Sequence, residues 1–366
     1  PIHTEGIRPA PLREGLEWVG RLAVLAAGAL LLGSGLAANA GVLGNVLGAI
    51  GATTARDAVL EAWTSDWRAW IQLAAVLAGF AVIVLSTLPL PGVRTRPGVY
   101  LSSALADPLR DFFSRYRSAA GLILALICLY RIPDFVLNIM NPFYLDLGYS
   151  LVEIAEIRKI FGVGMTMLGV FVGGLVVARY GELRAMVIGA FAGPVSNLLF
   201  IWLAFQEHSR WSLFIAIGLD NVAGGVAGTC LIAYMSSLTS AGFTATQYAL
   251  FSALYALPGR LIASQSGRIV ESAARAADAG GLFSVIKGLV ASQAPENFAT
   301  AMERSGVSPA ALGSGYVVFF TYSTLIGVFA ILLSFVVLRR QRREEPGPET
   351  PPGAPASPTR ESRPAR

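Results

Sequence analysis

The chain has 366 residues, of which 54% are hydrophobic and only 14% are charged, and its mean hydropathy is +0.59. Soluble globular domains carry about 25% charged residues, so this composition excludes an ordinary water-soluble domain. The formal net charge of +5 does not indicate a nucleic-acid partner, because the arginines are distributed by membrane side, as described below.

Long apolar stretches with few charges recur from one end of the chain to the other. A hydrocarbon core about 30 Å thick requires roughly 20 apolar residues of helix, and open strands would leave backbone groups unpaired in lipid. The pattern predicts transmembrane helices at 16–37, 68–89, 118–141, 155–178, 184–205, 211–237, 244–270 and 315–338. We therefore predict an all-α polytopic membrane protein with about eight spans in a lipid bilayer.

Side chains for catalysis or metal binding are scarce. The two cysteines, Cys128 and Cys230, lie within predicted spans, and the two histidines, His3 and His208, lie outside them. These residues supply neither a metal-ligand spacing nor a credible Ser/His/Asp set. We therefore expect no metal site, no cofactor and no enzymatic activity.

The basic residues between the predicted spans mark the two sides of the membrane. One side holds Arg8, Arg13, Arg94, Arg96, Arg110, Arg115, Arg117, Arg179, Arg184, Arg339, Arg340, Arg342 and Arg343. The opposite loops hold fewer basic residues, diluted by acidic ones. Because basic residues accumulate on the cytoplasmic side, both ends of the chain are predicted to be cytoplasmic.

Composition divides the chain into four parts. Residues 1–90 hold two spans and an outward loop, 91–117 form a proline-containing cytoplasmic linker, 118–338 hold six spans, and 339–366 are a charged, proline-rich tail expected to be disordered. Two spans before the linker and six after it are lopsided for a carrier built from six-helix halves. We therefore expect that about four helices are missing before Pro1.

Two long outward loops, 38–66 and 272–314, carry Gly, Ala and scattered charge. Two interpretations stay open: short interfacial helices over the mouth of a cavity, or variable decoration.

The third predicted span carries polar residues in its interior, where ionisable groups are costly unless they face protein or water. Arg131, Asp134, Asn138 and Asn141 follow one another at i, i+3, i+7 and i+10, which predicts a polar stripe on one helical face. Pro133 is expected to kink this helix. Arg131 and Asp134 could instead form a self-neutralising structural pair.

The sixth and seventh predicted spans carry further polar residues. Asp220 and Asn221 lie about ten residues into the sixth, and the seventh contains Gln247 and Arg260. Asp220 and Arg260 could pair as a static brace or as a gate. Asp134 or Asp220 could titrate, because burial raises an acid's pKa while an arginine neighbour lowers it.

Small residues four apart predict close helix contact. Gly169 and Gly173 form such a pair in the fourth span, and Gly224 and Gly228 form one in the sixth.

The turn between the fourth and fifth spans contains a recognisable motif. Its sequence is Gly174, Leu175, Val176, Val177, Ala178, Arg179, Tyr180, Gly181, Glu182, Leu183, Arg184. It resembles the Gly-x-x-x-Asp-Arg-x-Gly-Arg turn of major facilitator superfamily transporters, with Gly174, Arg179 and Gly181 in register. The acidic position is Ala178, and Arg184 stands two residues beyond the second basic position.

A wider resemblance points to one group of that superfamily. The carrying residues are Asp146 to Ser150, Glu153, Ile154, Asp220, Asn221, Ala233 to Leu238 and Phe243 to Leu250. They resemble the AmpG-type muropeptide permeases, within the peptide/acetyl-coenzyme A transporter branch. Under this resemblance the spans correspond to helices five to twelve of a twelve-helix carrier, whose helices nine and twelve face lipid. The fifth and eighth spans carry no Asp, Glu, Lys or Arg in their cores.

The resemblance implies a monomeric secondary transporter of the bacterial cytoplasmic membrane that imports anhydromuropeptide with protons, for cell-wall recycling. Arg131 or Arg260 would then engage a substrate carboxylate, and Asp134 or Asp220 would titrate. Sugar or amide groups would be bound by Asn138, Asn221 and Gln247. Another cargo, such as a siderophore, an acyl-coenzyme A or a drug, and a non-transporting scaffold or sensor of the same fold, remain alternatives.

Overall fold

The computed structural model describes residues 11–65, 67–88, 95–133, 139–263 and 265–344, and all secondary structure assigned within these ranges is helical. Seven described stretches are long and apolar enough to cross a membrane: Pro11–Leu36, Arg68–Thr87, Arg96–Tyr130, Leu151–Tyr180, Glu182–Ala204, Arg210–Ser237 and Pro309–Arg343. Each overlaps a predicted span, and α14 (Thr244–Ala263) lies at the remaining one. The prediction of an all-α polytopic membrane protein is confirmed.

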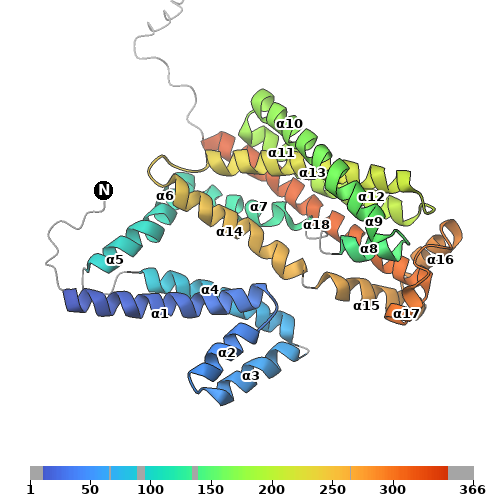
Figure 1. Cartoon of the computed structure of the whole chain (residues 1–366). Coiled ribbons are helices and arrows are strands. Elements are labelled where there is room, and N and C mark those ends of the chain that lie inside the picture. The colour runs from blue at the N-terminus through green and yellow to red at the C-terminus, as the bar shows by residue number, and fades with distance from the viewer. Residues whose placement is uncertain (1–10, 66, 89–94, 134–138, 264, 345–366) are drawn as a thin grey trace, which may run out of the picture.

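The N-terminal part is a pair of long helices, α1 (Pro11–Leu36) and α4 (Arg68–Thr87), joined by the helical hairpin of α2 (Gly41–Ala49) and α3 (Thr53–Thr64). A Cβ added at Gly79 would lie 2.7 Å from the carbonyl oxygen of Gly28, so glycine permits this close crossing. Figure 1 shows that α18 (Pro309–Glu344) ends on the same side as the start of α1. We call this side the termini end, and the side that carries α2 and α3 the hairpin end.

A buried ion pair on α1, formed by Glu17 and Arg21, binds both the end of α4 and Thr95, which precedes the next helix. Arg21 donates to the carbonyl oxygens of Ser86 (2.5 Å) and Leu88 (2.9 Å), at the end of α4. Glu17 Oε1 accepts from Arg21 Nε and from the hydroxyl of Thr95, both at 2.8 Å. Thr95 in turn accepts from the amide of Gly98 and caps the next helix.

Much of the predicted linker 91–117 is helical. It contains α5 (Arg96–Leu101), the π-helical turn η1 (Ser102–Ala106) and α6 (Asp107–Tyr116), and the turn η2 (Arg117–Ala119) leads into α7.

The third predicted span is not one continuous helix. The helix α7 (Ala120–Tyr130) ends before Pro133, and a new helix, α8 (Met140–Asp146), begins beyond the undescribed residues 134–138. Proline lacks the amide proton that would bond to the carbonyl four residues back, and it disfavours helical backbone at Ile132. The helix α7 therefore ends where the kink was expected. The polar face predicted for 131–141 runs through Asp134 and Asn138, which lie outside the described residues.

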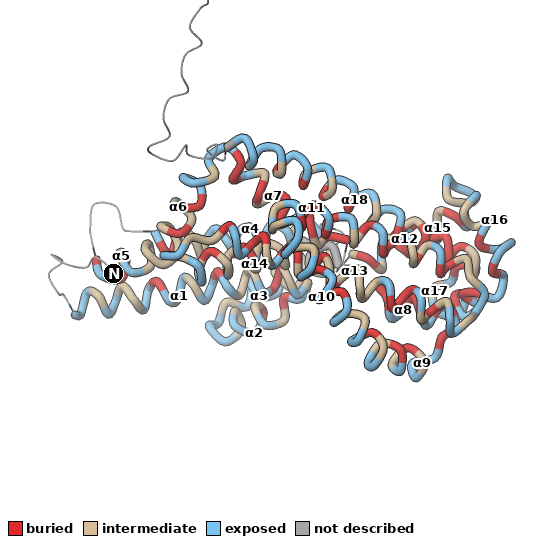
Figure 2. Tube along the Cα trace, turned by 90° about the horizontal axis from the view of Figure 1, so that it is seen from above, coloured by how far each residue is buried: buried red, intermediate tan, exposed pale blue. Residues whose placement is uncertain are grey.

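The remaining helices form the C-terminal bundle. They are α9 (Leu151–Glu156), η4 (Ile157–Gly162), α10 (Val163–Tyr180), α11 (Glu182–Ala190), α12 (Ala192–Ala204), α13 (Arg210–Ser237), α14 and α18, with α15 (Ser266–Asp278), α16 (Ser284–Gln293) and α17 (Ala301–Ser305) at the hairpin end. Figure 2 shows exposed residues along the outer sides of the long helices and buried residues between them.

Glycines set the contact between α10 and α13. A Cβ added at Gly173 would lie 2.9 Å from Thr229 Cβ, and one added at Gly225 would lie 2.6 Å from the carbonyl oxygen of Thr166. The predicted packing role of Gly169 and Gly173 is therefore confirmed. On α13 the packing residue is Gly225, because an added Cβ at Gly224 would meet nothing within 4 Å.

Aromatic side chains fill the bundle towards the hairpin end. Phe143, Phe298 and Phe320 are fully buried, and Phe143 lies 5.0 Å, ring centre to ring centre, from Tyr316. Phe200 joins the same cluster and also reaches the cavity described next.

Candidate functional site

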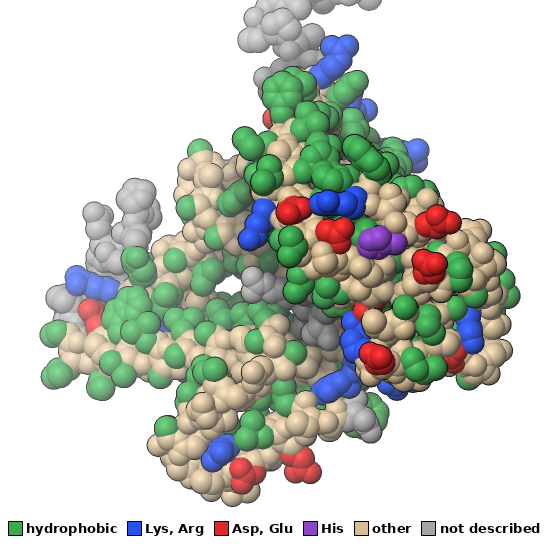
Figure 3. Space-filling view, turned by 45° about the vertical axis from the view of Figure 1, so that its right-hand side comes forward, with side chains coloured by type: hydrophobic (Ala, Val, Ile, Leu, Met, Phe, Trp, Pro, Cys, Tyr) green, Lys and Arg blue, Asp and Glu red, His purple; other side chains and the backbone are tan. Residues whose placement is uncertain are grey.

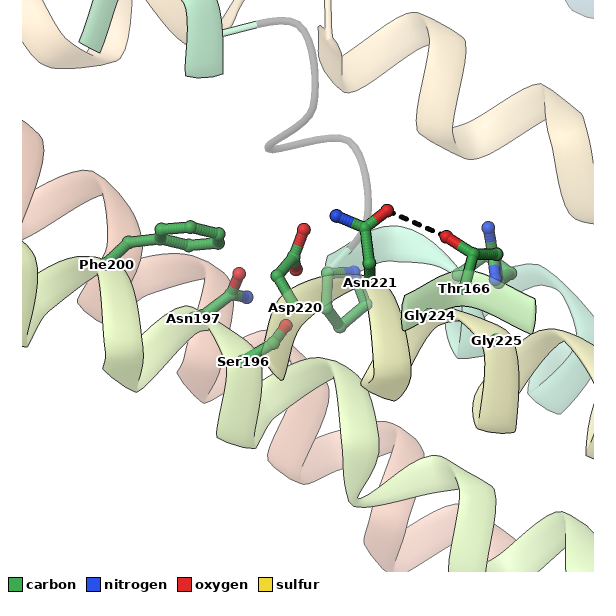
Figure 4. A pocket seen from close by; sticks show the side chains of 10 residues that line it. Thr166, Ser196, Asn197, Phe200, Asp220, Asn221, Gly224 and Gly225 are labelled. Carbon is green, nitrogen blue, oxygen red and sulfur yellow. Dashed lines mark hydrogen bonds between the residues drawn. The ribbon is translucent and has the colours of Figure 1, made fainter. Parts of the chain in front are cut away.

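A cavity of about 270 Å³ lies inside the C-terminal bundle. It is lined by Arg131, Pro133, Thr166, Ser196, Asn197, Phe200, Asp220, Asn221, Gly224 and Gly225. Figure 4 shows these side chains converging from α10, α12 and α13 on the break after α7. A helix break inside a membrane is tolerated where the freed backbone borders protein or a water-filled cavity, and Pro133 lies at such a place.

The cavity brings together two ionisable residues of opposite charge. Arg131 follows the last residue of α7, and its guanidinium lies 3.6 Å from the position of an added Cβ at Gly228. Asp220 projects from the middle of α13, beside Asn221 (Figure 4). The cavity lining therefore carries one positive and one negative formal charge. In such a lining the guanidinium of Arg131 can bind a ligand carboxylate, and the carboxyl group of Asp220 can bind a hydrogen-bond donor or a cation.

Asn221 is held by the helices around it. Its Oδ1 lies 2.8 Å from the hydroxyl oxygen of Thr166, and its Nδ2 donates to the carbonyl oxygen of Ile217 at 2.7 Å. The Thr166 hydroxyl is also 3.0 Å from the carbonyl oxygen of Gly162, so its single proton can go to either acceptor. A ligand can therefore take the place of Thr166 at Asn221, because the Thr166 hydroxyl keeps the carbonyl oxygen of Gly162 as an acceptor.

A buried hydrogen-bond chain supports the wall next to the break. Asn197 is 1% exposed and donates to Ser323 Oγ at 2.9 Å, and Ser323 donates to the carbonyl oxygen of Pro133 at 3.4 Å. This chain ties α12 and α18 to the end of α7. Sequence reasoning missed both side chains because it set the fifth and eighth spans aside for having no Asp, Glu, Lys or Arg in their cores.

The expectation that the fifth span only faces lipid is wrong. In the most apolar 18 residues of Glu182–Ala204, 50% are buried, whereas 17% are buried in those of Leu151–Tyr180. In addition, α12 supplies Ser196, Asn197 and Phe200 to the cavity. Neutral hydroxyl and amide side chains, which cost less to bury than charges, are the signal that the search for charged residues passed over.

The other predicted site residues have different positions. Asp134, Asn138 and the side chain of Arg260 lie outside the described residues. Asn141 accepts a hydrogen bond of 2.5 Å from Arg158. Neither Asn141 nor Gln247 is among the residues that line the cavity.

Gln247 lies in a polar cluster near the termini end. It is 1% exposed, and its Nε2 donates to the carbonyl oxygen of Pro108 at 2.9 Å and to Asp111 at 2.8 Å. Its Oε1 accepts from the amide of Ser240 at 2.8 Å and from Arg115 at 3.2 Å. Three of these bonds join α6 to the start of α14, and the fourth holds the turn before α14, so Gln247 acts here as a brace between helices.

The motif at the turn also lies away from the cavity. Gly181 separates α10 from α11 with a φ of +76°, a conformation that glycine adopts without strain. Arg179 and Arg184 are exposed, and the Arg179 guanidinium lies 5.9 Å from the centre of the Tyr180 ring. A Cβ added at Gly174 would meet nothing within 4 Å, so packing among the described residues does not explain why the motif has glycine at this position.

Two carboxylates fasten the segment between α15 and α18 to the bundle. Asp146, which is 3% exposed, pairs with Arg304 and accepts a 2.6 Å hydrogen bond from Tyr316. Asp278 pairs with Lys287 at 2.7 Å and accepts from Ser308. Burial alone would raise the pKa of Asp278, but these hydrogen bonds outweigh it and lower the pKa to about 2. No group of three or more His, Cys, Asp or Glu among the described residues could hold a metal ion.

Comparison with known proteins gives matches to named transporters, whereas no family model matches the chain. The chain is 36% identical over 169 residues to putative transporter AmpG 4 of Rickettsia conorii, covering 46% of this chain and 40% of the relative. The corresponding protein of Rickettsia felis is 32% identical over 213 residues, which are 56% and 51% of the two chains.

The anhydromuropeptide permease of Escherichia coli K12 is 30% identical over 219 residues, which are 58% of this chain and 44% of the permease. The chain thus spans about half the length, or less, of these curated relatives. Its apolar helices and these relatives make it a multi-pass protein of the inner membrane. The resemblance inferred from the motifs is confirmed: the chain is a relative of the AmpG-type permeases.

Proposed function

We propose that this protein is a secondary transporter of the bacterial inner membrane that imports anhydromuropeptide, coupled to protons, by alternating access. The observation that carries the proposal is the cavity within the membrane-spanning bundle, with Arg131 and Asp220 in its lining. Ionisable groups inside a membrane protein are costly, and those that border a cavity mark solute and proton pathways.

The roles follow from the chemistry of each group. Arg131 engages a carboxylate of the solute, since its guanidinium offers paired donors of fixed geometry. Asp220 is the proton-carrying acid, and the hydroxyl and amide groups of Thr166 and Asn197 face sugar or peptide groups. A cavity of about 270 Å³ is at the small end of ligand sites, so it holds one part of a sugar-peptide. The remainder of the solute would lie against facing helices of a second bundle.

We propose that the protein acts as a monomer and that the termini end faces the cytoplasm. The arginines of that end support the orientation, among them Arg115, Arg179 and Arg184, since basic residues are retained on the cytoplasmic side.

The test is uptake of labelled anhydromuropeptide by the full-length protein in vesicles with an imposed proton gradient. In Asp220→Asn, accumulation is expected to fall to the level seen without the gradient, while exchange of solute across the membrane continues. Asp57→Asn, the same change at an exposed position of α3, is the control and keeps full accumulation. Arg131→Gln is expected to raise the half-saturation concentration about 10- to 100-fold, since a hydrogen bond to a charged group contributes about 1.5–3 kcal/mol.

Unchanged gradient-driven uptake in Asp220→Asn would remove this acid from the mechanism. If the unmodified protein gives no flux under a gradient, the transport proposal itself fails in favour of a scaffold or sensor. Flux of a siderophore or a drug, with none of muropeptide, would keep the carrier and change its cargo.

A further inference from the structure

The hairpin of α2 and α3 is tied closely to two membrane-spanning helices. Its first helix begins at Gly41, shortly after α1 ends at Leu36, and its second ends at Thr64, shortly before α4 begins at Arg68. Asn39 Oδ1 accepts from the amide of Gly41 at 2.7 Å and fixes the entry turn. Because both connections are short, the hairpin stays beside the end of α1 and the start of α4, and Figure 1 shows it folded back below these two helices.

The exposed face of α2 is mostly apolar, with Asn45 as its polar side chain. Val42 and Val46 are 64% and 37% exposed, and Ile50, which follows the helix at the same spacing of four, is 70% exposed. The opposite side of α2 packs on α3, where a Cβ added at Gly44 would lie 3.2 Å from Leu60. The apolar face is therefore left over after the hairpin has closed on itself.

The second helix exposes the opposite chemistry. Arg56, Asp57 and Glu61 are all exposed on α3, whereas α2 contains no Asp, Glu, Lys or Arg. In Figure 3 the hairpin, lowest in the view, shows both signs of charge. The hairpin thus has a side formed by α2, which has no charged residue, and a charged side formed by α3. An element at a lipid–water boundary needs these two sides, one for lipid and one for water.

Exposed tryptophans stand at the start of α4, directly after the hairpin. Trp67 and Trp70, at the start of α4, are 70% and 67% exposed, and Trp211, at the start of α13, is 77% exposed. Exposed tryptophan is enriched where membrane spans enter the headgroup region, because its ring is apolar and its N–H needs a polar partner. The hairpin is thus followed directly along the chain by two tryptophans, Trp67 and Trp70, of the kind found where spans enter the headgroup region.

We propose that the α2–α3 hairpin lies in the lipid–water interface at the hairpin end, with α2 in the headgroup and acyl boundary and α3 facing water. The hairpin joins two helices that are apolar enough to cross a membrane and that expose apolar side chains, among them Val24 and Leu73, so lipid is the occupant that the exposed face of α2 favours. The proposal is independent of transport activity. It resolves the two interpretations of residues 38–66 in favour of an interfacial element.

The test is the depth of nitroxide labels on the full chain in liposomes, in a Cys128→Ala, Cys230→Ala background. Val42→Cys and Val46→Cys report on α2, and Asp57→Cys and Glu61→Cys are the matched controls on α3. All four positions are exposed, so labelling does not disturb a packed core. The ratio of collision rates with oxygen and with a water-soluble nickel chelate is expected to be several-fold higher on α2 than on α3, since oxygen concentrates in lipid.

Equal ratios on the two helices would overturn the proposal, because α2 would then face water. A label at Val46 shielded from both reagents, with spin–spin broadening that disappears on dilution with unlabelled protein, would also overturn it. That result would place a second copy of the chain on this face. Labels at Asp57 that report lipid would show that the hairpin lies the other way round.

Discussion

At the scale of single residues, Asn197 and Ser323 hold the wall of the cavity through their hydrogen bond, and we expect truncation of either side chain to destabilise the protein. In Ser323→Ala the Asn197 Nδ2 loses its acceptor while it remains buried, and an unsatisfied buried donor costs about 1–3 kcal/mol. We expect a loss of stability of that size, measured by thermal unfolding of the purified protein in detergent.

A neighbouring residue on the same helix provides the control for this prediction. Within the described part of the chain, the hydroxyl of Thr324 bonds only to the carbonyl of Phe320 in its own helix, at 2.9 Å, so Thr324→Ala is expected to cost less than about 1 kcal/mol. Adding Asn197→Leu to Ser323→Ala removes the stranded donor and is expected to recover part of the loss. Equal stability of Ser323→Ala and Thr324→Ala would show that the bond contributes nothing.

Sequence reasoning found cavity residues by their depth along a helix, and depth was sufficient for some of them. Arg131, Asp220 and Asn221 were predicted as site residues, and the structure places all three in the cavity lining. Gln247 was predicted by the same argument but lies in a cluster with Asp111. Depth gives the level of a residue in the membrane, whereas the neighbours on other helices decide whether its side chain meets a cavity or another side chain.

At the scale of helices, two adjacent glycines of α13 have different roles: Gly225 packs against α10, and Gly224 faces the cavity. In Gly225→Ala the new methyl group would lie 2.6 Å from the carbonyl oxygen of Thr166, and backbone cannot move aside as a side chain can. We expect α10 and α13 to be forced apart at a cost of about 1–3 kcal/mol, the usual cost of overpacking.

The adjacent glycine is a matched control for this change. Gly224→Ala points its methyl group into the cavity and is expected to leave the unfolding temperature nearly unchanged, although it narrows the space for a solute. The measurement is thermal unfolding of both variants beside the unmodified protein. A loss of stability in Gly224→Ala equal to that in Gly225→Ala would contradict the assignment of faces.

The break at Pro133 shows what the element pattern can and cannot supply. Hydropathy predicted a span here, and proline predicted a disturbance within it. The periodicity argument then assumed that one helix continued to Asn141, whereas α7 ends at Tyr130, and two of the four positions, Asp134 and Asn138, lie outside the described residues. Periodicity relates residues only as long as the helix that carries them is unbroken.

At the scale of the whole molecule, hydropathy predicted the class and the number of spans well because a bilayer imposes the length of each apolar segment. It gave no sign of how α1 is joined to the end of α4 and to the start of α5. The joint depends on Glu17 and Arg21, which stand in the first turns of a span that we judged by its apolar residues. Helix ends need partners for their last carbonyl groups, and Arg21 supplies them at the end of α4.

We predict that this joint determines the stability of the whole chain. Arg21→Met removes the donor from the carbonyl oxygens of Ser86 and Leu88 and leaves the Glu17 carboxylate buried without its partner. Breaking one side of a buried ion pair costs about 3–5 kcal/mol, so the unfolding temperature is expected to fall clearly. Arg56→Met, at an exposed position of α3, is the control and is expected to have little effect.

A second substitution separates lost charge from lost contact. Glu17→Gln combined with Arg21→Met removes the stranded charge, while the amide oxygen of the new side chain can still accept from Thr95. If the buried charge causes most of the damage, the double variant is more stable than Arg21→Met alone. Hydrogen exchange at the Gly98 amide, which is bonded to Thr95, then returns towards its rate in the unmodified protein. A double variant as unstable as Arg21→Met would instead mean that the carbonyl groups at the end of α4 depend on Arg21 itself, so that capping of that helix, and not charge balance, joins the two parts of the molecule.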